Sequence, residues 1–559
     1  MSTPAAPADA ASPSPPPSGE PPRRGNVVRS SMVFSGLTLV SRIMGLARDV
    51  AVSAYMGASA TIAADAYNTA LSFPNLFRRI FAEGAFTAAF VPAYARTLET
   101  EGQEAADRLA TDAMATLAAA TVVLTIAAQL AMPALMHVIN PGYADTPDKF
   151  NLAVLLTRIS MPYLPCMAIV ALLSGVLNAR GRFAISAVAP TLLNLFMLLA
   201  ILPQKTPEAS AVAASWGVVA AGVGQVALLV WAVRRVGARV RVTVPRLTPD
   251  IRKLIGLAIP GAIAASATQI NVFVSQSLSS GVDGARSWLS NADRFYQLPL
   301  GLVGVAIGVA LLPSLSRAVH AGDKEGAQSA MDDAVAFSMA LTLPAAAALM
   351  AMPFFLVDAM FTRGEFTIED ARQTAAALFH YGWGVPAFVL VRILAPAFFA
   401  RQDTKAPMKF ALVSVAINLV LGIALFHLIG VPGLAIATSV AAWSNVLLMA
   451  FSLARRKTWI LSGHAANRLV RIGVATAAMA AFLAAASWGR AYYEPVFGFI
   501  GDEAKLLALL VVCALGAALY GVLLFAVRAV TPGEIRRALR RQPAAKGEDG
   551  GAGPAMPLD

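Results

Sequence analysis

The stretch from Val33 to Phe90 combines two long apolar runs with an unusual number of charges. It reads VFSGLTLVSRIMGLARDVAVSAYMG over 33–57 and DAYNTALSFPNLFRRIFAEGAFTAAF over 65–90. Each run is long enough to cross a bilayer, which takes about 20 mostly apolar residues. A charge at the bilayer centre costs at least about 2.5–3.5 kcal/mol, so such residues usually face a polar cavity. The stretch therefore predicts membrane-spanning helices around a water-accessible cavity.

The composition of the whole chain supports the same class of protein. Of the 559 residues, 57% are hydrophobic and only 14% are charged, whereas soluble domains average about 25% charged residues. The apolar blocks are continuous rather than alternating, which favours helices over a membrane β-barrel. The net charge of +12 comes from short basic clusters between apolar blocks, as in cytoplasmic loops. We therefore predict an all-α polytopic membrane protein and expect no nucleic-acid partner.

The apolar blocks predict about fourteen spans between two tails. The predicted spans are 30–56, 62–95, 110–139, 150–177, 183–203, 209–233, 250–279, 285–316, 331–361, 370–399, 407–429, 431–453, 468–489 and 503–528. Residues 1–26 are rich in Pro and Ala and lack the apolar core of a signal peptide, so we expect a disordered cytoplasmic tail there. Residues 531–559 form a second cytoplasmic tail.

The orientation follows from the distribution of Lys and Arg among the loops. Every even-numbered connection is basic, as around Arg180, Arg234 and Arg401, whereas the opposite loops are short or acidic. Because cytoplasmic loops carry the excess of basic residues, both termini are predicted to lie in the cytoplasm. A miscount of one span would invert every loop downstream, so the agreement supports fourteen spans.

The chain contains an internal repeat. Pro92 corresponds to Pro313 (313 − 92 = 221), and Arg180 corresponds to Arg401 at the same offset (401 − 180 = 221). Parallel repeats related by an axis along the membrane normal are a transporter design, with the binding site between the repeats. We therefore predict an N-lobe over 27–240 (spans 1–6), a C-lobe over 241–460 (spans 7–12) and a helix pair over 461–530 (spans 13–14).

The charges of the first span have a defined geometry. At 1.5 Å per residue, Arg42 lies roughly 18 Å into a helix that begins near Ser30. Asp49 follows Arg42 by two turns and so shares its face. An alternative for Arg48 is that it reaches the outer interface and pairs with Asp49.

Other charges are predicted to join them from three further spans. The candidates are Arg78 or Arg79 with Glu83 in the second span, Asp65 at its start, Asp293 and Arg294 in the eighth, and Arg392 in the tenth. For Arg392, snorkelling to the cytoplasmic interface is the alternative. A cavity dominated by arginines favours an anionic ligand, because a guanidinium binds phosphate or carboxylate through two points. The sequence predicts no metal site and no catalytic residues.

Four motifs resemble those of the MurJ (MviN) family of bacterial lipid II flippases, within the MOP exporter superfamily. They are SRIMGLARD, FPNLFRRIFAEGAFTAAFVPAY, NADRFYQLPLGLVGVAIGVALLPSLS and LAPAFFARQDTKAPMKFA. The resemblance covers about 27–528 and implies two six-helix lobes plus two C-terminal helices. It also implies transport of lipid II, the undecaprenyl-diphosphate-linked peptidoglycan precursor, from the inner to the outer leaflet of the cytoplasmic membrane. No cofactor is expected.

The resemblance carries over to particular residues and partners. It implies that Arg42, Arg48, Asp49, Arg78, Glu83, Asp293 and Arg294 contact the substrate, and that a groove beside the last two spans holds the polyprenyl tail. The expected partners are lipid II and membrane lipids, with the cell-wall elongation and division machinery as a further candidate. Some members bind sodium through carboxylates of the seventh and eleventh spans. Here Asn418 and Gly422 occupy that part of the eleventh span, so we expect membrane potential to drive transport instead.

Two alternatives remain open at this point. One is a related MOP-superfamily exporter of another polyprenyl-linked glycan or of drugs. The other is a polytopic phosphotransferase or glycosyltransferase. Such an enzyme usually needs a metal-binding carboxylate pair or a catalytic His on a loop, and the sequence offers neither grouping.

Overall fold

The computed structural model describes residues 24–77 and 86–529, and the predicted Arg78, Arg79 and Glu83 lie outside them. The described residues form helices and no strands. The first six spans correspond to α1 (Arg24–Met56), α2 and α3 (Ala63–Phe77, Phe86–Thr100), α4 and α5 (Gln103–Leu130, Met132–Ile139), α6 and α7 (Pro147–Ser160, Tyr163–Ala179), α8 (Phe183–Ile201) and α9 (Pro207–Arg235). A 3-10 helix, η2 (Pro141–Asp145), joins α5 to α6.

The next eight spans follow in the predicted order. They are α10 (Pro249–Ser279), α11 (Ala285–His320), α12 and α13 (Lys324–Ala351, Pro353–Phe361), α14 and α15 (Ile368–Gly382, Val385–Phe399), α16 (Lys405–Ile429), α17 (Pro432–Arg455), α18 (Gly463–Tyr493) and α19 (Ala504–Ala526), with the 3-10 helix η3 (Glu494–Glu503) between the last two. Over residues 24–77 and 86–529, helices follow all fourteen predicted spans, several as two consecutive helices, and nine helical segments there are long and apolar enough to cross a membrane.

The breaks within spans fall at prolines. Pro133 and Pro353 each lie in the first turn of a new helix, at the starts of α5 and α13. A proline has no N–H to donate, so it is tolerated in a first turn and ends a helix that precedes it. Because the two prolines are 220 residues apart (353 − 133 = 220), the repeat recurs in the local helix geometry.

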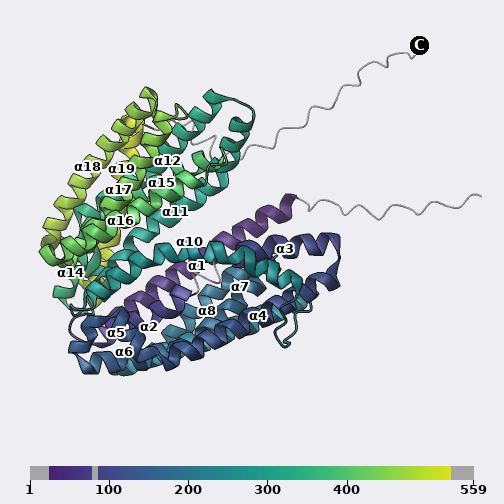
Figure 1. Ribbon diagram of the computed structural model, residues 1–559. Helices are drawn as coiled ribbons and strands as arrows, with labels where there is room; N and C mark the ends of the chain where they lie inside the picture. The colour runs from purple at the N-terminus through teal and green to yellow at the C-terminus, as the bar shows by residue number, and fades with distance from the viewer. Residues whose placement is uncertain (1–23, 78–85, 530–559) are drawn as a thin grey trace, which may run out of the picture.

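The helices assemble into two lobes that form a V (Figure 1). We call α1–α9 the first lobe and α11–α17 the second lobe. The lobes meet at the end that carries η2 and the start of α14, and they diverge toward the end that carries the start of α1 (Figure 1). We call these the closed end and the open end, and we use the opening for the region between α1 and α11 on the open-end side of the contact between Asp49 and Arg294.

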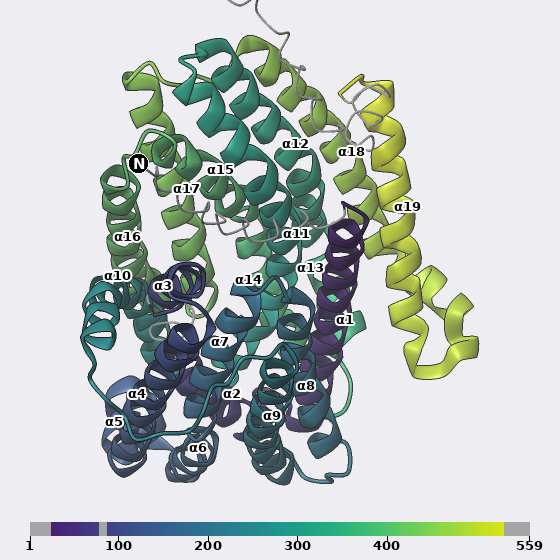
Figure 2. The same cartoon turned by 90° about the vertical axis from the view of Figure 1, so that its right-hand side faces the viewer.

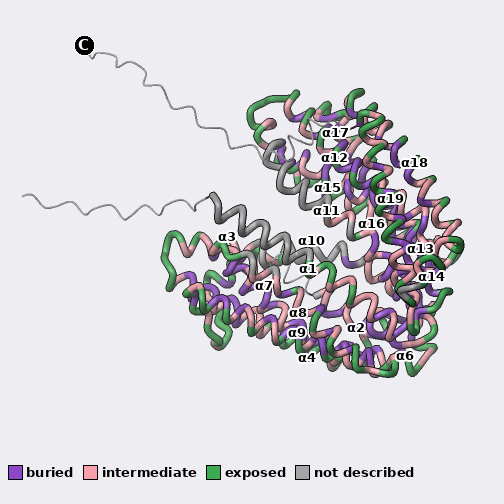
Figure 3. The backbone as a smooth tube through the Cα atoms, turned by 180° about the vertical axis from the view of Figure 1, so that it is seen from behind, coloured by how far each residue is buried: buried purple, intermediate pink, exposed green. Residues whose placement is uncertain are grey.

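Each lobe has its own apolar core. Buried residues line the inside of both lobes and recur where the lobes meet (Figure 3). One core cluster joins Phe90, Tyr94 and Leu229 of the first lobe to Ile251 of α10, so the start of α10 packs against the first lobe. Another joins Phe355 of α13 to Met479 of α18. The pair α18–α19 therefore lies on the flank of the second lobe (Figure 2).

Candidate functional site

Helices α1 and α11 face each other across the opening in antiparallel directions. Nε of Arg294 lies 3.1 Å from Oδ2 of Asp49. Seven residues farther toward the open end, the guanidinium of Arg42 lies against Gly301 (49 − 42 = 7 and 301 − 294 = 7). Arg42 and Asp49 thus share a helical face, as their spacing predicts, and that face is turned toward the second lobe.

Arg48 is the centre of a chain of polar contacts that links three helices. Its Nε and Nη2 donate to Oδ1 of Asp49 at 3.1 and 2.6 Å, and its Nη1 donates to Oδ1 of Asn194 on α8 at 2.9 Å. The side chains of Arg48 and Asp49 are each 13% exposed, whereas that of Arg294 is 41% exposed. Two guanidinium groups from different lobes therefore share one carboxylate.

Asn194 fixes the orientation of this chain. Its Nδ2 donates to the carbonyl oxygen of Ser41 at 3.0 Å, which leaves Oδ1 to accept from Arg48. The amide is buried, and a buried amide that lost its partner would cost about 1–3 kcal/mol. Asn194 therefore fixes the position of the Arg48 guanidinium relative to the backbone of α1.

Arg42 is exposed toward the opening and rests in a notch of α11. A Cβ atom built on Gly301 would overlap three atoms of the Arg42 guanidinium. The missing side chain at Gly301 thus lets an arginine of the first lobe lie against the backbone of the second lobe.

We expect Gly301→Ala to displace Arg42 and to weaken binding of a diphosphate head group by about tenfold. That factor corresponds to about 1.4 kcal/mol, close to one charge-assisted hydrogen bond. The matched control is Gly473→Ala on α18, where an added Cβ meets nothing within 4 Å. Binding of a labelled polyprenyl diphosphate to the purified protein measures both. Equal affinities for the two variants would contradict this role of the notch.

The space at the apex of the opening is small. It measures about 30 Å³ and is lined by Arg48, Asp49, Tyr67, Asn68, Ser287, Asn291 and Arg294, among others. A single water needs about 10–15 Å³ by this measure, so no sugar or diphosphate fits there in this state. A ligand of that size would meet Arg294 and Arg42 from the wider side.

The closed end is held by an ion-pair cluster around Asp65, which we call the first clasp. Nζ of Lys149 lies 2.9 Å from both Asp65 Oδ2 and Asp283 Oδ1. Asp65 also accepts from the backbone N–H of Gly284 and Ser287 and from Oγ of Ser287 at 2.8–3.1 Å. Asp65 and Lys149 are at most 2% exposed. Asp65 of the first lobe thus caps the first turn of α11 in the second lobe.

A second clasp mirrors this arrangement with the lobes exchanged. Asp370 at the start of α14 accepts from the backbone N and Oγ of Ser59 in the first lobe, at 3.0 and 2.5 Å. It also accepts from Nε1 of Trp288 at 2.8 Å. The backbone N–H of Glu365 donates to the carbonyl of Ala54 at 2.8 Å. Each lobe therefore offers one carboxylate to the other.

Glycines allow the two lobes to approach so closely. A Cβ on Gly364 would overlap the carbonyl of Ala54, and Gly364 also has φ of +60°. A Cβ on Gly142 would overlap the backbone of Gly281. The closed end is thus sealed by direct backbone contact, as well as by the two clasps.

The structure distributes the sequence-predicted charges over different places. Arg48, Asp49 and Arg294 come together, and Arg42 lies on the same side of α1. Asp293 pairs with Gln297 on α11. Arg392 is exposed on α15, and no contact described for residues 24–77 and 86–529 joins it to Arg48, Asp49 or Arg294.

One expectation was wrong and two residues were missed. Asp65 was expected among the cavity charges, but it lies in the first clasp because Lys149 and the start of α11 surround it. Lys149 and Asp370 were not singled out from the sequence. A lysine in an otherwise acidic loop and a Thr-x-x-Asp cap at Thr367 were the available signals.

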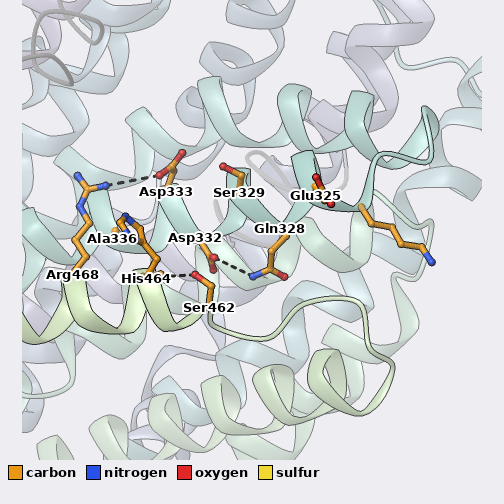
Figure 4. Close-up of a pocket in the computed structure, with 11 residues that line it drawn as sticks. Glu325, Gln328, Ser329, Asp332, Asp333, Ala336, Ser462, His464 and Arg468 are labelled. Carbon is orange, nitrogen blue, oxygen red and sulfur yellow. Dashed lines mark hydrogen bonds and ion pairs between the residues drawn. The ribbon is translucent and has the colours of Figure 1, made fainter.

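A larger cavity of about 390 Å³ lies elsewhere, between α12 and the start of α18 (Figure 4). Asp332 accepts there from Nε1 of Trp459 and Nε2 of Gln328, each at 3.0 Å. Arg468 faces Asp333 across the cavity at 3.8 Å (Figure 4). Of these contacts, the one between Arg468 and Asp333 links α18 to α12 of the second lobe. Within the described ranges, no three His, Cys, Asp or Glu residues are grouped to hold a metal ion.

The fold and the site together define a polytopic helical membrane transporter with two lobes. Comparison with known proteins gives the family. The profile described as "Lipid II flippase MurJ" matches residues 52–499. A "Probable lipid II flippase MurJ" of Rhizobium meliloti (strain 1021) is 40% identical over 522 residues, which are 92% of this chain and 97% of the relative. The chain belongs to the MurJ lipid II flippase family, and is therefore a transporter rather than an enzyme.

Further comparisons agree with this family. "Lipid II flippase MurJ" of Burkholderia cenocepacia is 33% identical over 438 residues, covering 77% of this chain and 84% of the relative. The solved structure of "Lipid II flippase MurJ, inward closed conformation" superposes with a TM-score of 0.70 at 22% identity, covering 91% of this chain and all of that one. An inward-facing MATE transporter of the MOP superfamily superposes with a TM-score of 0.62 at 15% identity, covering 76% of this chain and 98% of that one. These two likenesses concern the fold.

Proposed function

We propose that this chain carries lipid II from the inner to the outer leaflet of the bacterial cytoplasmic membrane by alternating access. The observation that carries the proposal is the chain Arg48–Asp49–Arg294, which joins the two lobes at the apex of the opening. The names of its relatives supply the substrate. The predicted N-lobe, C-lobe and helix pair are the units that move or support the movement.

The open end faces the cytoplasm in this proposal. The basic loops and the start of α1 lie at that end, as the positive-inside rule requires for cytoplasmic segments. The state described is then open toward the cytoplasm and closed toward the periplasm. Lipid II, which is made on the cytoplasmic side, would enter from the leaflet through the opening.

The head group is captured by exchange of anions at the apex. A diphosphate that reaches Arg294 and Arg42 competes with Asp49 for the guanidinium of Arg294, which is the more exposed of the two partners of Asp49. Guanidinium groups bind phosphate through two parallel hydrogen bonds. Release of Asp49 from Arg294 breaks the ion pair between α1 and α11. Binding of the head group therefore changes a contact that joins the two lobes.

The other proposed substrate contacts include two residues, Arg78 and Glu83, that lie outside the described ranges. Arg78 and Glu83 on the second span, with Asp293 and Arg392, are assigned to the head group by the family motifs and the sequence. The polyprenyl tail stays in lipid beside α18 and α19. The inside-negative potential drives an anionic head group outward, at about 2.3 kcal/mol per charge for 100 mV.

A leaflet-specific assay of lipid II tests the proposal. In cells that depend on this chain, Arg42→Ala and Arg294→Ala should leave lipid II on the inner leaflet while its synthesis continues. We expect a loss of transport of about 10- to 100-fold for each, because each removes a charge-assisted contact of about 1.5–3 kcal/mol. Arg234→Ala, at the exposed end of α9, is the matched control. Loss of lipid II synthesis itself would point to an enzyme, and normal transport in all three variants would contradict the site.

A further inference from the structure

The two clasps occupy equivalent positions of the internal repeat. Arg286 is the counterpart of Asp65 (286 − 65 = 221), and Asp370 is the counterpart of Lys149 (370 − 149 = 221). The helix starts agree, since α6 begins at Pro147 and α14 at Ile368 (368 − 147 = 221). The same two places in each lobe therefore carry one acid and one base, with the charges inverted.

The two lobes use their pairs differently in this state. In the first lobe, Lys149 and Asp65 form an ion pair at 2.9 Å. In the second lobe, Nη1 of Arg286 donates to Oδ1 of Asn140 in the first lobe at 3.2 Å, and Asp370 accepts from Ser59 of the first lobe. Although both residues belong to the described part of the chain, they form no ion pair with each other.

This arrangement has an electrostatic cost. Arg286 is 7% exposed, Asp370 is fully buried, and the hydrogen-bond partners of both side chains are neutral. Of the other charged groups of the clasps, Asp65, Lys149 and Asp283, only Asp65 acts electrostatically on Arg286, and it forms no ion pair with it. A buried charge without a counter-ion in direct contact is costly, because water is lost and neutral dipoles replace most of it. In the closed end, the opposite charges of Arg286 and Asp370 are therefore kept apart, although an ion pair between them would neutralise both.

The geometry within the second lobe allows them to meet. Nε1 of Trp288, two residues after Arg286, already donates to Oδ1 of Asp370. The first turns of α11 and α14 are therefore adjacent, like those of α2 and α6 in the first lobe, where Asp65 and Lys149 touch. By the repeat, positions 286 and 370 correspond to positions 65 and 149, whose side chains do touch.

We propose that Arg286 and Asp370 exchange partners during transport. They bind the first lobe while this end is closed, and they form an ion pair with each other when it opens. The exchange rests on the alternating access proposed above. It gives the outward-open state a contact that replaces those lost across the lobes, so opening and closing stay reversible.

A double-mutant cycle on the conformational equilibrium tests the exchange. Spin labels on Ala144 and Arg372, exposed positions at the closed end of the first and second lobes, report the ratio of open to closed molecules in nanodiscs. Cys166 and Cys513 are first replaced by Ser. Gly364→Ala serves as the background, because its Cβ loosens the closed end without removing a charge. The cycle compares Arg286→Gln, Asp370→Asn and the double variant.

An ion pair present only in the open state makes the two substitutions non-additive in one direction. The open-to-closed ratios of parent and double variant, multiplied together, should exceed the product of the single-variant ratios by about two- to fivefold, the range of a solvent-accessible ion pair. The matched control is the cycle of Arg286→Gln with Ser59→Ala, which removes the hydroxyl bond from Ser59 to Asp370 but keeps the backbone bond and the carboxylate. That cycle should be additive.

Every result of the cycle is decisive. Additivity for Arg286 and Asp370, or coupling in the opposite direction, would overturn the exchange, since the latter means attraction in the closed state. If Arg286→Gln proves too unstable to measure, Arg286→Met should show the same coupling to Asp370→Asn, whereas Arg286→Lys, which keeps the cation, should show little coupling. The readout needs no lipid II, so a chain that transports another substrate would still show the exchange. Failure of the exchange would equally leave the proposed substrate untouched.

Discussion

Arg48→Ala is expected to reduce lipid II transport by about 100-fold or more. The substitution leaves Asp49 with a single partner and leaves Oδ1 of Asn194 without its donor. Loss of a hydrogen bond to a charged group costs about 1.5–3 kcal/mol, and a hundredfold change corresponds to about 2.8 kcal/mol, so loss of the contacts to Asp49 and Asn194 accounts for the expected effect. The leaflet-specific assay for lipid II in cells that depend on this chain gives the measurement.

The chemistry of Arg48 is tested by a substitution that keeps its charge. Arg48→Lys should also fail, because one ammonium group cannot replace the separate guanidinium nitrogens that reach Asn194 and Asp49. Arg234→Lys at the exposed end of α9 is the matched control and should transport normally. Transport by Arg48→Lys at the parental rate would show that only the charge matters, and the need for separate contacts to Asn194 and Asp49 would have to be abandoned.

Lys149→Met is expected to open the closed end. It removes the cation between Asp65 and Asp283, and Asp65 is 1% exposed. The uncompensated carboxylate costs about 3 kcal/mol in the dry clasp, while water solvates it when the lobes separate. The equilibrium should therefore shift about 100-fold toward the open state. Distances between spin labels on Ala144 and Arg372 measure the shift.

Two further variants separate the clasp from general stability. Lys505→Met removes a cation from another buried carboxylate, that of Asp358, which also binds Arg490. It lies between the second lobe and the helix pair, so it should lower the melting temperature without lengthening the label distance. Asp65→Asn combined with Lys149→Met should recover part of the closed state, because the buried charge disappears with its partner. An unchanged distance in Lys149→Met would show that the first clasp does not hold the lobes.

The spans and their pairing into a repeat were predictable from the sequence. A bilayer leaves no water for backbone groups, so each crossing must be a long apolar helix and is visible as such. The shared face of Arg42 and Asp49 followed from helical periodicity alone.

The partners of the charged residues could not be predicted in the same way. Asp65 has the same residue type and a similar apolar setting as Asp49, yet one lies in the first clasp and the other at the apex of the opening. What separates them is Lys149, 84 residues later (149 − 65 = 84), and the first turn of α11. Nothing in the local sequence of Asp65 encodes those neighbours.

The sequence by itself determined the membrane class, the two-lobed repeat and the basic side of the protein, since hydropathy and charge act locally along each helix. The tertiary structure decided which charges hold the lobes together and which are left for a ligand. That division depends on how two helices from different lobes meet, as Arg294 meets Asp49 and Asp370 meets Ser59. Such contacts are fixed by the packing of whole lobes, because a side chain can pair only with groups that the fold brings within a few ångströms.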